Sequence, residues 1–532
     1  MCSSNPNQDN SHKIITVLFL VACLLVGVLI CMRISAGKTS DKSRSLDSQI
    51  QQILHLIETS YVDDCDADTL TNDVLNSILT SLDPHSHYVS AEEMTKQNEE
   101  IQGYFQGIGA ILGNDNDTVC IHEIIPNSPS EVAGLRPGDR IIRIDTFHAV
   151  KQDVSEAVKR IRGPQHSKVN LTIRRLYEKQ LRTISVYRNV IETNSLTYSG
   201  MLNTSTGYIS LSRFSETTYA EFRNALLALK RQGMKELILD LRSNAGGLLA
   251  AAINIADDFL PNGDMIVYTE GAHQSKQEIK ATRGGLFEEG KLIVMIDEFS
   301  ASASEVVSGA IQDNDRGIIV GRRSFGKGLV QQQFELSNGG AVWLTIARYH
   351  TPSGRCIQRP YDRGTDEYYS QFLNELVESS LTDSILLKIT DSTKYYTKSG
   401  KVVYGGGGIF PDKTIPHKKD QSFVFYNKIN EKRIIYDYAF SQVSHNYETL
   451  ITQYPNVNTF AESFQTSEAM LHDIYALAKG KGIQPDNNSA QTEKLIRTLL
   501  KAYIAQSLYG QGAFTRIYLS IDDDILTTLK LL

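Results

Sequence analysis

KLIVMIDEFSASASEVVSGAIQD, residues 291 to 313, joins an apolar run to a helical pattern through a turn rich in small residues. Its first seven residues are typical of a buried strand. After the turn, apolar side chains recur at the spacing of one helix face, namely Ala303, Val306, Val307 and Ala310. Apolar strand patterns of the same kind occur in ELILDLR (236–242) and GIIVG (317–321). This alternation of strand and helix predicts an α/β core with its functional residues at the carboxyl ends of the strands.

Ser302 lies in that turn and has two interpretations. The spacing Ser302-x-x-Glu305 is that of a capping box, in which the serine only caps the helix. The small residues around it favour instead an exposed nucleophile at a strand-to-helix turn, with backbone N–H groups beside it. Because a free serine hydroxyl is a weak nucleophile at neutral pH, this second interpretation requires a base elsewhere in the chain.

Lys327 is the candidate base. It belongs to GRRSFGKG (321–328), which has the glycine-to-lysine spacing of a phosphate-binding loop. That loop needs Ser or Thr directly after the lysine and then a helix, whereas Gly328 follows here and LVQQQFEL (329–336) is patterned as a strand entering a hairpin. A P-loop ATPase is therefore disfavoured. A lysine becomes a base when burial lowers its pKa from about 10.4 toward about 7 to 8, and a solvated loop lysine is the alternative.

The segment that begins near residue 98 changes to short β-type runs. YFQGIGA (104–110) and AGLRPGDRIIRID (133–145) resemble a PDZ domain, which we place at residues 98–185. The resemblance implies that a peptide adds as a strand to a sheet edge while backbone N–H groups of the glycine loop hold its terminal carboxylate. The loop residues so implied are Gly107, Ile108 and Gly109. Taken alone, these glycines would indicate only a turn.

Four motifs follow one another between residues 239 and 358. They are LDLRSNAGG (239–247), SASASE (300–305), DNDRGIIVGRRSFGKGLVQQ (313–332) and YHTPSGRCIQ (349–358). Together they resemble the C-terminal processing peptidases, the tail-specific serine proteases of the S41 family. The resemblance extends from about residue 48 to residue 416 and includes the PDZ domain. It implies an endopeptidase that cleaves proteins near their C-termini.

The family resemblance also implies a Ser–Lys dyad that needs neither metal nor cofactor. Ser302 is then the nucleophile, Lys327 the general base, and Gln331 the residue that orients the lysine. The oxyanion hole comes from the backbone N–H groups of Ala303 and Gly246.

Two positions depart from the motifs of the family. The usual NPGG reads NAGG (244–247), and the usual threonine before FGKG is Ser324. Neither change removes a catalytic atom, but we expect loss of the proline to loosen the oxyanion loop. The alternative function is that of a catalytically inactive, membrane-tethered PDZ scaffold that binds protein C-termini. All three side chains implied in catalysis are present, which disfavours that alternative.

Residues 14–32, IITVLFLVACLLVGVLICM, form an uncharged apolar run long enough to span a bilayer. We expect an uncleaved transmembrane anchor, with a short tail (1–13) before it and a linker and helical region (33–97) after it. A long signal sequence is the alternative. The family resemblance implies a single-pass protein of the cytoplasmic (inner) membrane, with its catalytic body in the periplasm.

The rest of the chain is divided into a catalytic core (186–416) and a mostly helical region of unknown role (417–532). The helical region is a candidate for contacts in a homo-oligomer. Its end, TTLKLL, is a self-processing site, a ligand of the PDZ domain, or part of one face of a terminal helix formed by Ile525, Leu526, Leu529 and Leu532. The expected partners are proteins with apolar C-terminal tails, and the sequence implies no particular adaptor.

Composition excludes several other classes of protein. The net charge is −7, and Lys and Arg are scattered without the basic stripe of a nucleic-acid binder. His85 and His87 form an H-x-H pair without a third ligand nearby, and the cysteines have no metal-binding spacing. No nucleic acid, metal or cofactor is therefore expected.

Overall fold

The computed structural model of the protein describes residues 41–115, 117–282, 284–381, 392–417, 424–485 and 489–532. The chain divides into two compact units after Ser77. The first contains α2 (Asp41–Ser60) and most of α3 (Ala67–Thr80). The expected membrane segment, 14–32, lies outside the described residues, and none of the helices within them is both long and apolar enough to cross a membrane.

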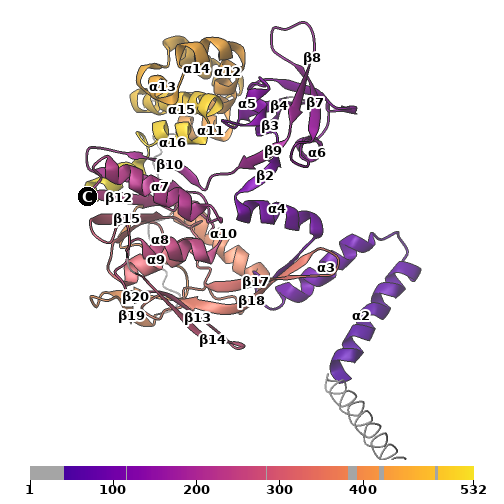
Figure 1. Cartoon of the computed structure of the whole chain (residues 1–532), viewed down its shortest axis with the longest axis vertical. Coiled ribbons are helices and arrows are strands. Elements are labelled where there is room, and N and C mark those ends of the chain that lie inside the picture. Colours follow the sequence, from indigo (N-terminus) through magenta and orange to yellow (C-terminus); the bar gives the residue numbers. More distant parts are fainter. Residues whose placement is uncertain (1–40, 116, 283, 382–391, 418–423, 486–488) are drawn as a thin grey trace, which may run out of the picture. The chain divides into compact units, whose positions relative to one another are not determined.

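A six-stranded sheet forms the centre of the second unit, and three helices pack against one of its faces (Figure 1). In spatial order the strands are β10 (Leu196–Met201), β11 (Thr206–Leu211), β12 (Glu236–Asp240), β15 (Lys291–Ile296), β16 (Ile318–Gly321) and β21 (Lys413–Thr414). The helices are α7 (Thr218–Arg231), α8 (Leu249–Asp257) and α9 (Ala303–Asp313). From β11 to β21 all neighbours are parallel, so their carboxyl ends share one edge. The predicted α/β core is confirmed.

Both faces of this sheet are buried. Successive side chains of a strand point to opposite faces, so Leu239 and Val294 pack with the three helices in one cluster. Ile238 and Met295 belong to a second cluster on the other face, which Ile525 from the end of the chain helps to complete. A strand that is buried on both faces appears in the sequence as a continuous apolar run, which explains the absence of polar alternation in KLIVMI.

A second, antiparallel sheet contains the strand that follows the lysine loop. Its strands are β1 (His87–Val89), β18 (Ala341–His350), β13 (Met265–Gly271), β14 (Gln274–Lys280) and β17 (Leu329–Glu335). β17 and β18 form the hairpin expected after Gly328, with Gln331 opposite Thr345. β1, from far upstream, also pairs with β18 and places His87 opposite Trp343.

The region that resembles a PDZ domain folds into a six-stranded antiparallel sheet with two short helices. Its elements are β3 (Ala110–Asp115), β4 (Thr118–Ile124), α5 (Pro129–Val132), β5 (Arg140–Ile144), β6 (Phe147–His148), α6 (Val154–Ile161), β7 (Lys168–Arg174) and β8 (Arg182–Tyr187). β3 is an edge strand of this sheet. Helix α4 (Ala91–Gln102) and a two-stranded ribbon of β2 (Tyr104–Gly107) and β9 (Asn189–Glu192) flank it.

The C-terminal region is helical, as expected. Its elements are α11 (Val424–Glu431), α12 (Ile434–Gln453), α13 (Val457–Ser463), α14 (Glu468–Gly480), α15 (Ser489–Tyr509), α16 (Gln511–Tyr518), α17 (Asp523–Thr528) and the 3-10 turn η3 (Leu529–Leu531). They enclose a core of their own. They also reach the PDZ sheet, where the His122 ring stacks on Phe440 with 4.4 Å between ring centroids.

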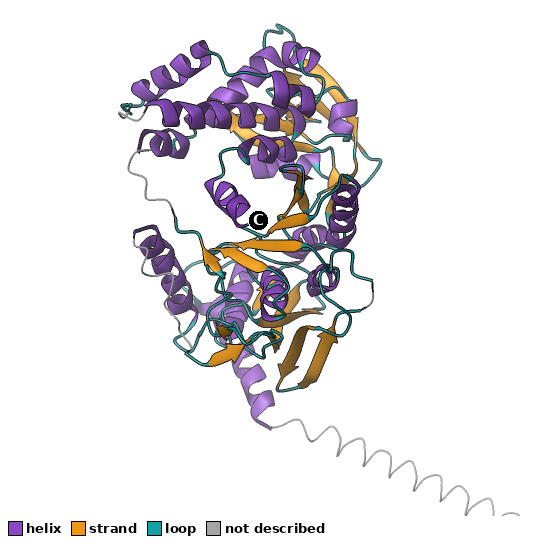
Figure 2. Cartoon of the chain, turned by 90° about the vertical axis from the view of Figure 1, so that its left-hand side faces the viewer, coloured by secondary structure: helices purple, strands orange, loops and turns teal. Residues whose placement is uncertain are grey.

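The apolar end of the chain lies on the core sheet (Figure 2). Ile525 is 1% exposed, and Leu529 and Leu532 pack against the same cluster. Leu526 is 40% exposed and does not share this face. Three of the four residues predicted to form one helix face therefore pack against the same cluster, but only Ile525 of these three lies in α17, since Leu529 begins η3 and Leu532 follows it. The remaining described elements are α10 (Thr365–Leu381) and a short hairpin of β19 (Lys394–Tyr396) and β20 (Val402–Tyr404).

Candidate active site

Ser302 lies at the strand-to-helix turn between β15 and α9. Its backbone has φ +55° and ψ −112°, a conformation that non-glycine residues rarely adopt and that stores strain. Its N–H donates to Glu305 Oε2 at 2.8 Å, and its carbonyl accepts the hydroxyl of Tyr349 at 3.3 Å. Every residue of α9 is buried, whereas Ser302 is only half-buried. The turn therefore has the conformation and the exposure of a nucleophile elbow.

Lys327 lies in the loop between β16 and β17, with its side chain bonded to Gln331. Nζ donates to Gln331 Oε1 at 2.8 Å. Burial lowers the pKa of Lys327, although the nearby carboxylates of Asp83 and Glu305 oppose that shift. A lowered pKa is what a lysine needs to act as a base near neutral pH. Because the loop leads into a strand, it lacks the helix N-terminus of a phosphate-binding loop.

A segment far upstream holds Gln331 in place. Gln331 Nε2 donates to the backbone carbonyl of His85 at 2.6 Å. The Asp83 carboxylate keeps that segment in a turn, since it accepts the N–H groups of His85 and Ser86, both at 2.8 Å, and the Ser86 hydroxyl at 2.6 Å. The Ser86 hydroxyl accepts in turn the N–H of Thr345, the residue opposite Gln331 on β18. The residue predicted to orient the lysine is thus itself oriented from both sides.

The sequence alone assigned no catalytic role to this DPHSHY segment (83–88). His85 is 9% exposed, and its Nε2 lies 3.1 Å from the hydroxyl of Tyr368. Burial, together with the nearby Lys327, lowers the pKa of His85 to about 3, so the ring is neutral. Over the ranges that the structure describes, no three side chains are grouped as metal ligands. The local signal for a rigid turn was Asp83-Pro84 with Ser86 two residues later, since Asp, Pro and Ser are residue types typical of turns.

Glu305 is the second residue whose role the sequence did not reveal, because there it has only the spacing of a helix-capping residue. Its side chain is 0% exposed. Oε2 accepts the backbone N–H groups of Ser302 and Lys327 at 2.8 and 2.9 Å. Oε1 accepts the N–H of Gly326 at 2.7 Å and the hydroxyl of Ser324 at 2.5 Å. Burial raises the pKa of Glu305 to about 7, against the effect of these donors. One carboxylate thereby joins the serine turn to the lysine loop.

The backbones of Gly246 and Ala303 approach each other beside Ser302. Gly246 has φ +102°, and a Cβ there would lie 2.8 Å from Ser302 Cβ and 3.0 Å from Ala303 N, so only glycine fits. The Gly246 N–H donates to the side-chain oxygen of Asn244 at 2.9 Å. The two residues predicted to form the oxyanion hole are therefore brought together, but the Gly246 amide is bonded within its own loop.

The predicted peptide-binding loop of the PDZ domain follows β2. Ile108 is 2% exposed and belongs to the core of the domain, and its carbonyl accepts the N–H of Ser130 at 2.8 Å. Gly109 has φ +77°, and a Cβ there would lie 2.2 Å from Ser128 Cβ. Gly107 ends β2 and Gly109 directly precedes the edge strand β3. This places the loop at the end of the edge to which a peptide strand adds in PDZ domains.

Three family profiles match the chain. Peptidase family S41 matches residues 205–366, the PDZ domain matches residues 121–175, and a family of unknown function, DUF8443, matches residues 425–510. The chain is 34% identical over 349 residues to a carboxy-terminal-processing protease of Bartonella bacilliformis, covering 64% of this chain and 80% of that protein. It is 30% identical over 367 residues to a probable CtpA-like serine protease of Staphylococcus epidermidis, covering 66% of this chain and 74% of that protein. Among solved structures, a photosystem II D1 C-terminal processing protease is 28% identical with a TM-score of 0.32, covering 57% of this chain and 82% of that one.

The α/β core with its serine turn, joined to a PDZ domain, defines a peptidase that carries a PDZ domain. The chain belongs to the carboxy-terminal-processing proteases of peptidase family S41. The helical C-terminal region matches a family without an assigned function, so neither similarity nor motif explains its presence.

Proposed function

We propose that this chain is a serine endopeptidase that cleaves protein substrates near their C-termini, with Ser302 as nucleophile and Lys327 as general base. The observation that carries the proposal is the shared acceptor Glu305 Oε2, which binds the backbone N–H groups of both residues. A shared buried acceptor keeps the two loops at a constant separation. Proton transfer between their side chains depends on that separation, since reactive groups must be held in place to react efficiently.

The chemistry follows from these positions. Neutral Lys327 accepts the hydroxyl proton of Ser302 as Oγ attacks the carbonyl carbon of a peptide bond. The carbonyl oxygen becomes an oxyanion that accepts the N–H groups of Ala303 and Gly246, the latter after giving up its bond to Asn244. When the C–N bond breaks, the protonated lysine donates its proton to the leaving amine. A water molecule, deprotonated by the lysine, then hydrolyses the acyl-enzyme ester and restores the serine.

The PDZ domain has the role of recognising the substrate tail in this proposal. Gly107, Ile108 and Gly109 bind the terminal carboxylate, and the tail adds along β3, whose outer edge has no strand partner within its described sheet. The proposed substrates are proteins with apolar C-terminal tails, as the family resemblance implies. Tail binding either delivers the substrate or gates the catalytic site. The two modes predict opposite effects when the groove is disabled.

Membrane attachment and location belong to the same proposal. Residues 14–32 anchor the chain once in the cytoplasmic membrane, and the catalytic body lies in the periplasm. Alkaline phosphatase fused to the C-terminus should then be active, while a fluorescent protein fused to the N-terminus should report the cytosol. A cytosolic report from the C-terminal fusion would contradict this orientation. Contacts between copies through residues 417–532 are tested by light scattering of the purified protein, where a monomer argues against them.

The central experiment is cleavage of a loosely folded reporter that ends in a free apolar C-terminus. The full-length wild type and Ser302→Ala are compared in detergent. Cleavage by the wild type alone supports the peptidase and its nucleophile. Tail binding without cleavage by either protein would favour the inactive scaffold instead.

A further inference from the structure

Two arginines stand at the bases of the loops that carry the proposed catalytic groups. Arg242 follows β12 and precedes Gly246 by four residues, and Arg322 follows β16 and precedes Lys327 by five. β12 and β16 both pair with β15 in parallel, so the two arginines lie at the same edge of the sheet. Their side chains are largely buried, with exposed fractions of 17% and 10%. A buried arginine needs an acidic partner, because an uncompensated buried charge is strongly unfavourable.

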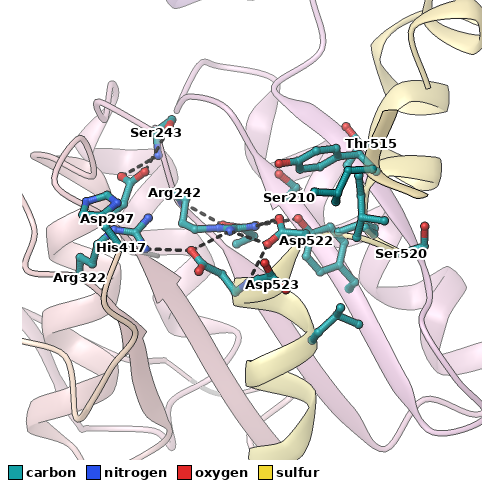
Figure 3. A pocket seen from close by; sticks show the side chains of 18 of the residues that line it. Ser210, Arg242, Ser243, Asp297, Arg322, His417, Thr515, Ser520, Asp522 and Asp523 are labelled. Carbon is teal, nitrogen blue, oxygen red and sulfur yellow. Dashed lines mark hydrogen bonds and ion pairs between the residues drawn. The ribbon is translucent and has the colours of Figure 1, made fainter. Parts of the chain in front are cut away.

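The C-terminal segment of the chain supplies such partners. Asp522 Oδ2 accepts a hydrogen bond from Arg242 Nη2 at 2.9 Å, at the wall of a pocket between this segment and the core sheet (Figure 3). Asp524 Oδ2 accepts from Arg322 Nη1 at 2.9 Å and from Arg242 Nη1 at 3.3 Å. One carboxylate of this segment therefore bridges the oxyanion loop and the lysine loop, which are 282 and 202 residues upstream.

Each arginine also has an acidic partner within the catalytic core. Arg242 Nη2 lies 2.6 Å from Asp240 Oδ2, and Arg322 Nε lies 3.1 Å from Glu298 Oε2. Glu298 belongs to the turn that leads to the proposed nucleophile, so the network reaches the three loops of the site. The two core pairs are separate from each other. Asp524 is the group that both arginines share.

The C-terminal segment is held in place by contacts other than these ion pairs. Ile525 is 1% exposed and packs with Tyr208 and Ile238 on the face of the core sheet. Asp522 Oδ1 accepts the N–H groups of Asp524 and Ile525 at 3.0 and 3.2 Å, which caps the start of α17. The segment is thus packed on the core sheet independently of the ion pairs, and its carboxylates extend from there to the oxyanion loop and the lysine loop. Removing the charge of Asp524 leaves the cap and the apolar contacts intact.

We propose that Asp524, assisted by Asp522, is a positioning residue of the peptidase. Through it, the C-terminal segment fixes the position of the oxyanion loop relative to the lysine loop. The inference rests on the proposed function of those loops. A displacement of about 1 Å costs on the order of a hundredfold in rate, so a small shift at the bases of the loops affects the chemistry. The helical region that ends in this segment also stacks on His122 of the PDZ sheet, and so connects the peptide-recognition module with the catalytic loops.

The test compares the full-length wild type with Asp524→Asn, which keeps the shape of the side chain and removes its charge. We expect kcat for a tail-bearing reporter to fall roughly tenfold to a hundredfold, with KM little changed. The rate at which a fluorophosphonate probe labels Ser302 should fall by a similar factor. The matched control is Glu468→Gln, which removes an ion pair with Arg497 in the same helical region, where the glutamate side chain is 87% exposed. The control should keep the kcat of the wild type.

Labelling rates are divided by the folded fraction, which is measured by thermal unfolding. A variant that is only less stable then shows the same normalised labelling rate as the wild type. Wild-type kcat and wild-type labelling in folded Asp524→Asn overturn the inference and leave the proposed function standing. A wild type that is neither active nor labelled overturns the proposed function, and the inference with it. If Asp524→Asn does not fold, Asp524→Glu decides, because it keeps the charge and moves the carboxylate by one methylene. A severalfold fall in its kcat supports the positioning role, and wild-type kcat overturns it.

Discussion

Ser302 and Lys327 donate their backbone N–H groups to one and the same oxygen, Oε2 of Glu305, at 2.8 and 2.9 Å. Ser302 lies in the turn before α9, and Lys327 lies in the loop after β16. The distance between the two residues is therefore not determined by the conformation of the turn or of the loop alone. The buried carboxylate does so by accepting hydrogen bonds from both. The geometry of the proposed dyad therefore depends on a third residue, Glu305.

Glu305→Gln should lower both stability and activity. The amide keeps one acceptor oxygen and places an NH₂ donor where the carboxylate accepts two hydrogen bonds. A buried donor without an acceptor costs about 1 to 3 kcal/mol, so we expect the free energy of unfolding to fall by about 2 to 4 kcal/mol and kcat to fall in the protein that remains folded. The control is Glu278→Gln, in an exposed ion pair with Lys276, which should change stability by less than about 0.5 kcal/mol. Equal effects of the two substitutions in urea unfolding would contradict the bridging role.

Lys327→Ala and Lys327→Arg should both abolish cleavage without unfolding the protein. Arginine keeps the positive charge but does not lose its proton in proteins, so it separates the role of a base from that of a charge. In the wild type, kcat/KM should rise with pH through a midpoint below 10.5, the ordinary pKa of lysine, because burial lowers the pKa of Lys327 and only its neutral form accepts a proton. A pH profile between about 6 and 10 measures that midpoint. Full activity of either variant would remove the lysine from the mechanism.

His85 should make the folded protein sensitive to acid. Its ring stays neutral in the folded state down to a pKa of about 3, whereas its ordinary pKa is 6.5. Below pH 6.5 the unfolded chain binds a proton that the native state does not, so stability that is fully present above this pH is lost progressively as the pH falls toward 3. His85→Gln removes the titration and keeps a polar group near Tyr368. Urea unfolding at about pH 7.5 and pH 5 measures the free energy of unfolding at each pH. Between the two, this free energy should fall less in the variant than in the wild type. An equal fall would show that groups other than His85 cause the acid sensitivity.

Gly109→Ala should disable the peptide loop of the PDZ domain, and Gly134→Ala is its matched control. Both glycines have nearly the same φ, +77° and +76°, but an added Cβ meets Ser128 Cβ at 2.2 Å in the first case and nothing within 4 Å in the second. Gly134→Ala should therefore lower the free energy of unfolding only by the backbone strain of the left-handed conformation, about 1 to 2 kcal/mol. Binding of a labelled tail peptide should be lost in Gly109→Ala alone, and unchanged binding would exclude this loop as the carboxylate site. Lower turnover in that variant would indicate delivery by the PDZ domain, and higher turnover would indicate inhibition.

The sequence by itself determined those features that depend on neighbours along the chain. The strand before Ser302, the helix after it and the hairpin after Gly328 all follow from periodicity and turn residues. The turn at Gly109 was also expected from the sequence, whereas its left-handed φ of +77° and that of Gly246, +102°, are findings of the structure. The motifs that resemble family S41 proved sufficient to assign the class of enzyme.

Only the tertiary structure decided which distant groups meet. Gln331 bonds to His85, 246 residues upstream, and Asp524 meets Arg322 across 202 residues. Apolar runs such as KLIVMI show that a sheet is buried on both faces, but they do not reveal which segment covers the second face. That segment proved to be the end of the chain, with Ile525 at its centre. In the sequence, Glu305 shows only the spacing of a helix-capping residue. Its role as a bridge could not be predicted, because hydrogen bonds between separate loops form only when the packing of the sheet brings those loops together.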